Sequence, residues 1–256
     1  TKRRWSLMSI LDFFKRNKTD NLEPLDLSWM VSDMHSHLIP GIDDGSESLE
    51  ESLILIKRLE GYGLKKLIIT PHVMTEFYRN TPEIIHEGLE QLRLACQKEK
   101  ISIQLESAAE YYLDEIFLEK VINGSRLLTF GKNHVLVETG FMSKPSMLLE
   151  SFFKLEMEGY QPVFAHPERY LYLHHDLELL ESMADRNISF QLNLLSLTGY
   201  YSKPVKKFAE KLIDEGLVKL VGTDCHNERY LDFMEKLPEE KYFHKLQSLD
   251  LLNKTL

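Results

Sequence analysis

Two histidines separated by one residue lie in a polar stretch that reads VSDMHSHLIPGIDD from Val31 to Asp44. If residues 29–37 form a strand, the side chains of His35 and His37 point to the same face, about 7 Å apart along the chain. Two imidazoles in that arrangement could bind one metal ion. The pair alone is a weak signal, because two histidines at this spacing could equally lie on the surface.

Further acidic and histidine side chains follow short apolar runs that we expect to be strands. These runs cover residues 67–70, 101–109, 134–137, 162–165, 188–193 and 217–221. Amphipathic helices are expected between them, at residues 46–61, 82–99, 113–122, 145–158, 177–184 and 203–215, with one or two more after Glu228. The polar residues at or just after the ends of the expected strands are His35, His37, His72, Glu110, Glu138, His166, Asp224 and His226.

The order of the expected elements is about seven repeats of a strand followed by a helix. Short connections of this kind are typical of right-handed crossovers in a parallel sheet. The pattern therefore favours an α/β barrel over a sandwich or a helix bundle. In such a barrel the carboxyl ends of the strands share one face, so residues far apart in sequence converge there. An open, doubly wound sheet would gather only the residues near its switch point.

Imidazole and carboxylate groups are ligands for divalent ions such as Mn²⁺, Fe²⁺, Zn²⁺ or Mg²⁺. Eight candidate ligands, or nine with Asp44, exceed what a single tetrahedral ion needs, so we expect more than one ion. A carboxylate such as Glu110 could bridge two ions about 3.5 to 4 Å apart, an arrangement that activates water in phosphoryl transfer. Strand alternation points Cys225 away from such a site. We expect no role there for His86, His134, His174, His175 and His244.

Length and composition exclude several classes of protein. The 256 residues carry a formal net charge of -9, which argues against general nucleic-acid binding. The two cysteines, Cys96 and Cys225, are too few for a disulfide framework, which suggests a reducing compartment. No apolar run approaches the roughly 20 residues that span a bilayer. We expect a single cytoplasmic domain over residues 30–256.

The first 29 residues form a basic extension to that domain. Leu7, Ile10, Leu11 and Phe14 recur in it at helical spacing. A short amphipathic helix there could rest on an anionic membrane surface, on a partner or on the protein's own body, and the last is the simplest reading. Because the chain does not begin with Met, we expect either processing or a natural start at Met8.

Taken together, these motifs resemble the PHP (polymerase and histidinol phosphatase) superfamily. The resemblance rests on DMHSH at residues 33–37, TPH at 70–72, the strand-end Glu110 and Glu138, HPER at 166–169 and TDCH at 223–226. HLIPGIDDG at residues 37–45 and the HPER segment are similar to the bacterial tyrosine phosphatases of capsular and exopolysaccharide operons. The resemblance covers roughly residues 30–230. It implies a distorted, TIM-like (β/α)7 barrel with three metal ions, usually manganese.

The resemblance also implies a role for each candidate. It assigns one ion to His35, His37, Glu110 and Asp224, a second to Glu110, Glu138 and His166, and a third to Asp44, His72 and His226. Arg169 would clamp the substrate phosphate with its planar fork, and Arg229 is a second candidate clamp whose spacing need not match the family's. A metal-bound hydroxide would attack phosphorus directly. In agreement, neither cysteine is followed by the Cys-x5-Arg pattern of ordinary tyrosine phosphatases.

The function that this resemblance implies is hydrolysis of phosphotyrosine on the tail of a membrane-associated tyrosine kinase, near the inner face of the membrane. Two alternatives stay open. One is a small-molecule phosphoesterase of the same superfamily, similar to a histidinol phosphatase. The other is a metal-stabilised binding module without turnover, in which Arg169 would be dispensable.

Overall fold

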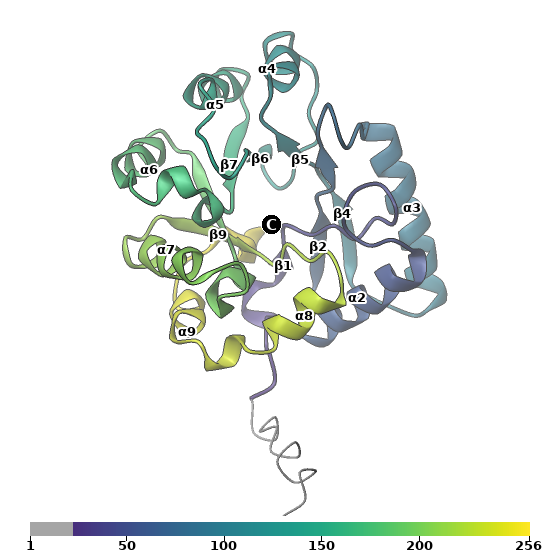
Figure 1. Cartoon of the computed structure of the whole chain (residues 1–256). Coiled ribbons are helices and arrows are strands. Elements are labelled where there is room, and N and C mark those ends of the chain that lie inside the picture. Colours follow the sequence, from purple (N-terminus) through teal and green to yellow (C-terminus); the bar gives the residue numbers. More distant parts are fainter. Residues whose placement is uncertain (1–22) are drawn as a thin grey trace, which may run out of the picture.

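The computed structural model describes residues 23–256 and places short parallel strands inside a ring of helices (Figure 1). Two sheets have the strand orders β1-β2-β4 and β3-β5-β6-β7-β8-β9. The strands are β1 (Ser32–Asp33), β2 (Lys66–Ile69), β3 (His72–Val73), β4 (Gln104–Ser107), β5 (Glu110–Tyr112), β6 (His134–Glu138), β7 (Gln161–Ala165), β8 (Ser189–Asn193) and β9 (Val218–Gly222).

Backbone hydrogen bonds join the two sheets into one ring of seven strand positions. β2 continues into β3 past Pro71, whose missing N–H interrupts the ladder. β4 continues into β5 through Ala108 and Ala109, and the Glu110 amide donates to the Pro71 oxygen at 3.1 Å. On the other side, the amide of Asp224 donates to the oxygen of His35 at 2.8 Å, which links the last strand to the first. The predicted (β/α)7 barrel is confirmed.

Eight α-helices surround the strands within the described residues: α2 (Leu49–Gly61), α3 (Pro82–Lys98), α4 (Glu115–Ile122), α5 (Leu148–Met157), α6 (Leu177–Ala184), α7 (Lys203–Asp214), α8 (Glu228–Met234) and α9 (Lys241–Gln247). Side-chain oxygens cap several of their starts. Ser48 caps α2 and Thr81 caps α3, each accepting a bond from a backbone amide three residues on. Short 3₁₀ turns occupy Ser28–Met30, Pro167–Arg169, Leu171–Leu173, Leu194–Thr198, Leu237–Glu239 and Leu252–Thr255.

The first expected strand is wrong in its extent. Residues 28–30 form a 3₁₀ turn, and Val31 has a φ of 67°, so only Ser32 and Asp33 pair as a strand. The expected strand 101–109 is also shorter, because β4 spans only Gln104–Ser107 and Glu110 begins β5. The expected helix starts at residues 46, 113 and 145 lie two or three residues early, since the capping side chain or turn comes later in each case.

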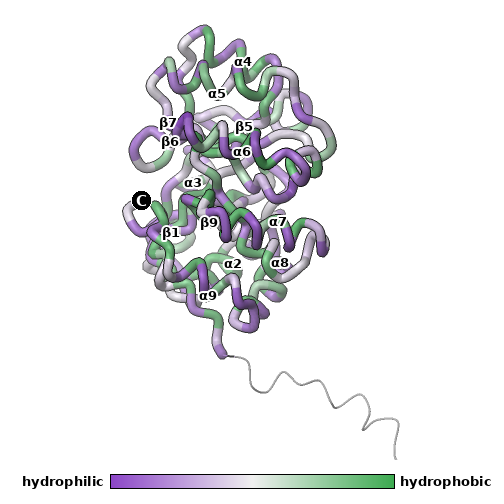
Figure 2. The backbone as a smooth tube through the Cα atoms, turned by 90° about the vertical axis from the view of Figure 1, so that its left-hand side faces the viewer, coloured by the Kyte–Doolittle hydropathy of each residue, from purple (hydrophilic) through white to green (hydrophobic). Residues whose placement is uncertain are grey.

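Two apolar clusters support the barrel. The larger lies between strands and helices, and Figure 2 shows apolar and polar stretches alternating along the chain that builds it. The smaller comes from strand residues such as Leu136 and Val163, together with Met34 just after β1, and these side chains fill the barrel interior. Leu25 and Leu27 are buried in the larger cluster, so the packed body begins ahead of residue 30.

The expected amphipathic helix of the N-terminal extension lies outside the described residues, and its membrane contact stays a prediction. Among the helices that the structure describes, none has the length and apolar content to cross a bilayer.

Candidate active site

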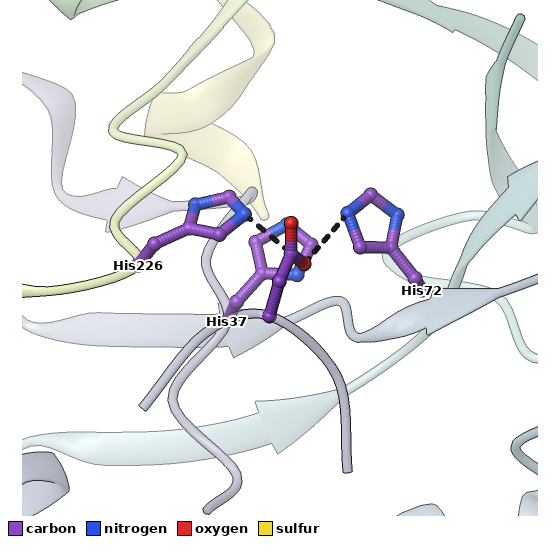
Figure 3. A group of neighbouring side chains, drawn as sticks. His37, His72 and His226 are labelled. Atoms are coloured by element: carbon purple, nitrogen blue, oxygen red, sulfur yellow. Dashed lines mark ion pairs between the residues drawn. The ribbon is translucent and has the colours of Figure 1, made fainter. Parts of the chain in front are cut away.

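The barrel brings together all nine residues that the sequence singled out as candidate metal ligands. Their ligand atoms form overlapping groups in which all atoms lie within 4.8 Å of one another. Figure 3 shows three of the imidazoles, from His37, His72 and His226, around one carboxylate, which belongs to Asp44. The four groups are His37, Asp44, His72 and His226; His35, His166 and Asp224; His35, His37 and Glu110; and His72, Glu110 and Glu138.

Four ligand atoms from two of these groups, one each from His35, His37, Glu110 and Asp224, lie close together. Nε2 of His35 lies 3.2 Å from Nε2 of His37. Glu110 Oε2 lies 3.2 Å and 3.4 Å from these two nitrogens, and Asp224 Oδ1 lies 3.3 Å and 3.4 Å from them. These four residues are the set that the resemblance assigns to the first ion. All four are buried.

Glu110 connects this group to its neighbours through both carboxylate oxygens. Oε1 lies 2.9 Å from His166 Nε2, whereas Oε2 faces His35, His37 and, at 3.2 Å, His72 Nδ1. Glu138 Oε1 lies 2.8 Å from the same His72 nitrogen. The geometry therefore agrees with the bridging role that the sequence analysis suggested for the Glu110 carboxylate.

The sets expected for the second and third ions match the observed groups only in part. Asp44 Oδ1 lies 3.3 Å from His72 Nε2 and 3.6 Å from His226 Nε2, as expected for the third ion, and His37 joins this group. The expected second set of Glu110, Glu138 and His166 does not form one group among the described residues. His166 lies with His35 and Asp224 instead, and Glu138 lies with His72.

The arrangement of the ligand atoms is better suited to binding divalent cations than to forming hydrogen bonds with one another. Glu110 Oε2 and His72 Nδ1 are buried and have no hydrogen-bond partner in the described part of the chain, although each lies close to other donors or acceptors. A buried polar atom left in this state is costly, and a cation between the side chains would remove that cost. The donors are nitrogen and oxygen, because Cys225 is buried in the apolar core, as predicted.

The electrostatics of the cluster also favour bound cations. Burial lowers the pKa of His72, but the charges of Glu110 and Glu138 outweigh it and raise the value to about 10. Burial raises the pKa of Glu110, yet the neighbouring charges of His35 and His72 hold it well below its usual range. The carboxylates thus draw positive charge into the cluster, and metal ions would compete with protons for the same positions.

Two residues that orient the ligands were missed by the sequence reasoning. Asp43 Oδ2 lies 2.8 Å from His37 Nδ1 and accepts the amide of His72 at 3.1 Å. Gln191 Oε1 lies 2.9 Å from His35 Nδ1. A carboxylate or amide on the far nitrogen fixes the ring and its tautomer, so that Nε2 faces the metal position. The available signals were the acidic pair that contains Asp43 and a polar side chain within the buried β8.

Arg169 lies beside the ligand cluster in a cavity of about 340 Å³. Its guanidinium carbon lies 4.5 Å and 4.3 Å from the ring centres of Phe141 and Tyr201. Its Nη1 donates to Asp224 Oδ2 at 3.1 Å. The guanidinium is therefore held in place by two aromatic faces and one carboxylate, next to the candidate ligands. The cavity is also lined by Asp44, His72, Met74, Phe77, Tyr78, Glu110, Tyr112, Glu138, Thr139, Gly140, His166, His226 and Tyr230.

Arg229 does not line this cavity. It is exposed, and its guanidinium lies 5.8 Å and 5.9 Å from the ring centres of Tyr200 and Phe233. Its role as a second clamp stays a prediction. The five histidines for which no role was expected are likewise absent from the residues that line the cavity.

Comparison with known proteins agrees with this site. YwqE, a tyrosine-protein phosphatase of Bacillus subtilis (strain 168), is 27% identical over 201 residues, which are 78% of this chain and 79% of YwqE. A crystal structure from work on YwqE of B. subtilis and CpsB of Streptococcus pneumoniae, described as metal-dependent tyrosine phosphatases, superposes with a TM-score of 0.72. It has 27% sequence identity and covers 87% of this chain and 94% of that one.

A more distant match shows the fold alone. The histidinol phosphate phosphatase of Lactococcus lactis subsp. lactis has a TM-score of 0.51 and 16% identity, covering 82% of this chain and 93% of that one.

The family model described as capsular polysaccharide synthesis, CpsB/CapC, matches residues 31–235. Because this match spans most of the chain, the protein belongs to the CpsB/CapC family of capsular polysaccharide synthesis proteins.

Proposed function

We propose that this protein is a metal-dependent phosphatase that hydrolyses phosphotyrosine in a protein substrate. The observation that carries the proposal is the cluster of nine candidate ligands at the carboxyl ends of the strands, with Arg169 beside it in the same cavity. The relatives YwqE and CpsB are named as tyrosine-protein phosphatases. Shared family membership and a shared fold support the same activity here.

The chain's own residues account for phosphate binding and orientation. Arg169 can present two N–H groups to two phosphate oxygens, and stacking between Phe141 and Tyr201 limits its rotation. Divalent ions in the cluster would lower the pKa of a bound water and neutralise the phosphate charge, which is the chemistry that hydrolysis requires. Buried Asp43 and Gln191 hold the imidazoles that would bind these ions.

Aromatic walls suit a phenyl phosphate better than a small aliphatic one. Phe77, Tyr78, Tyr112 and Phe141 line the cavity together with Arg169. The ring of phosphotyrosine could stack against these side chains while its phosphate reaches the guanidinium. The proposal therefore includes the ring as a recognised part of the substrate.

The partner that we propose is the phosphorylated tail of a tyrosine kinase that acts in capsular or exopolysaccharide synthesis. We propose that the two proteins interact in the cytoplasm near the membrane. The family description supports the pathway, and the names of the relatives support the phosphotyrosine. We propose manganese as the native metal and three ions as their number. The net charge of -9 would repel an anionic tail, so the ions and Arg169 must offset that charge locally.

One assay separates this proposal from its alternatives. The protein, purified without chelator, is incubated with a phosphotyrosine peptide or with histidinol phosphate, in Mn²⁺, Fe²⁺, Mg²⁺, Zn²⁺ or EDTA, and released phosphate is measured. We expect turnover of the peptide with metal and its loss in EDTA. Preference for histidinol phosphate would favour the small-molecule phosphoesterase, which the fold of the L. lactis enzyme also permits. No turnover of either substrate would refute a phosphatase and favour a binding module.

A further inference from the structure

A second cavity, of about 330 Å³, adjoins the one that contains Arg169. Met74, Phe77 and Tyr112 line both cavities, so the two share a wall. We call the second one the side cavity. Its remaining lining residues are Thr75, Glu76, Asp114, Glu115 and Ile116. None of these five belongs to the ligand cluster or lines the cavity of Arg169.

Phe77 is one of the residues that line both cavities. It lies in the turn from Met74 to Tyr78, which is closed by two backbone hydrogen bonds of 2.8 Å and 3.0 Å between these residues. The turn leaves Phe77 73% exposed, and Ile116 across the side cavity is 42% exposed. Large apolar side chains held in solvent beside a catalytic cavity indicate a surface that a binding partner covers.

The side cavity combines these apolar walls with negative charge. Glu76, Asp114 and Glu115 line it, and no lysine or arginine is among its lining residues. Asp114 also caps α4 by accepting the amide of Phe117 at 2.7 Å, which partly offsets its charge. Arg79 donates to the oxygen of Thr75 at 2.9 Å and brings one positive charge near the wall. The balance stays negative, because Glu76 and Glu115 are exposed carboxylates.

A long cationic side chain is the group that fits such a surface. The methylene stem of lysine or arginine packs against apolar walls while its charged end meets carboxylates at the edge. An aromatic face such as that of Phe77 or Tyr112 adds a favourable contact to the cation. A peptide residue advances the chain by only about 3.3–3.6 Å, so a residue next to phosphotyrosine, or one further, can reach across the shared wall.

We propose that the side cavity binds a lysine or arginine side chain of the protein substrate, one or two residues away from the phosphotyrosine. This inference rests on the proposed function and adds a sequence preference to it. Substrates with basic neighbours of the phosphotyrosine are preferred, and those with acidic neighbours are disfavoured.

The test compares synthetic phosphotyrosine peptides that differ only in the flanking residues, at one or two positions on either side, which are lysine, alanine or glutamate. We expect kcat/KM to be roughly tenfold higher for the best lysine peptide than for its glutamate counterpart, since a few partly exposed charge pairs change sign between them. In Glu115→Lys this ratio should fall to about twofold or less.

Glu119→Lys is the matched control. Glu119 lies on the same helix, one turn beyond Glu115, is exposed, and does not line the side cavity. Glu119→Lys changes the net charge by the same amount as Glu115→Lys. The ratio should therefore stay near tenfold in Glu119→Lys if the position of the charge, and not the total charge of the protein, sets the preference. Melting temperatures of both variants establish that each is folded.

Two outcomes overturn the inference in distinguishable ways. Turnover of all peptides with equal kcat/KM, or an equal fall of the ratio in both variants, would exclude the side cavity as the site of selection while the phosphatase activity stands. Absence of turnover on every peptide would remove the proposed function itself, and the inference with it.

Discussion

Replacement of Arg169 tests whether the cavity binds a phosphate group. In Arg169→Ala the guanidinium is lost, whereas in Arg169→Lys the positive charge remains but the planar fork is lost. The candidate ligand Asp224 retains other partners in both variants, because Asn193 Nδ2 lies 2.6 Å and the Tyr201 hydroxyl 3.3 Å from its Oδ2. The ligand cluster is therefore expected to survive the change.

The size of the effect follows from the contacts that Arg169 can make. A hydrogen bond to a charged group contributes about 1.5–3 kcal/mol, and a guanidinium between two rings is already oriented for two of them. A loss of about 3–4 kcal/mol of transition-state stabilisation corresponds to a fall in kcat/KM of about 150- to 1,000-fold for Arg169→Ala. Lysine keeps one point of attachment, so the fall for Arg169→Lys should be about 10- to 50-fold.

The assay is phosphate release from a phosphotyrosine peptide with saturating Mn²⁺, accompanied by metal analysis of each variant. Arg126→Ala serves as the control, because Arg126 is an exposed arginine that does not line the cavity of Arg169. Activity within about threefold of the wild type in Arg169→Ala, at unchanged metal content, would refute the phosphate-clamp reasoning. A fall in metal content parallel to activity would instead assign Arg169 to support of Asp224.

Three further predictions concern the surroundings of the site and the pH dependence of stability. Asp43→Asn weakens the bond to His37 Nδ1, and we expect about 10- to 100-fold weaker Mn²⁺ affinity by titration; unchanged affinity would contradict this role. Arg229→Ala should change kcat/KM by less than about threefold, since Arg229 does not line the cavity, and a hundredfold loss would establish it as a second clamp. Burial lowers the pKa of His134 below 6.5, so the folded state resists its protonation and stability falls as the pH drops below that value. Urea unfolding of His134→Gln should show a weaker fall from pH 7 to pH 5, by up to about 1.4 kcal/mol per pH unit, and parallel pH profiles would exclude this contribution.

The order of elements could be predicted because local sequence signals agree with the packing. The helix predicted at residues 177–184 is present with those bounds, since an apolar stripe and a capping Asp176 both define it. The strands β8 and β9 are mostly buried and lie within a residue of their predicted ends. The convergence of the nine candidate ligands follows from topology alone, because parallel strands in a barrel present their carboxyl ends at one face.

Other features depend on contacts that only the folded chain provides. The short first strand could not be predicted from local sequence. At Asp33 the strand pairing stops, and the Asp33 side chain instead accepts a hydrogen bond from the amide of Thr223, 190 residues away. The observed grouping of side chains differs in part from the expected sets for the same reason, and the assignment of ligands to individual ions stays a prediction. Which carboxylate oxygen faces which imidazole depends on side-chain rotation, and sequence spacing does not contain that information.

The backbone conformation at two candidate ligands explains why a simple strand pattern does not predict where their side chains point. His166 and Asp224 have φ values of 31° and 50°, in the left-handed region that costs side-chain-bearing residues about 1–3 kcal/mol each. Neighbouring hydrogen bonds hold both: the His166 oxygen accepts the amide of Arg169 at 2.9 Å, and the Asp224 amide donates to His35 at 2.8 Å. The left-handed turn at each strand end breaks the alternation that a continued strand would impose. The first of these bonds holds Arg169 next to His166, and Arg169 Nη1 donates to Asp224 Oδ2 at 3.1 Å. The strained turns therefore position the candidate phosphate clamp together with the candidate ligand cluster.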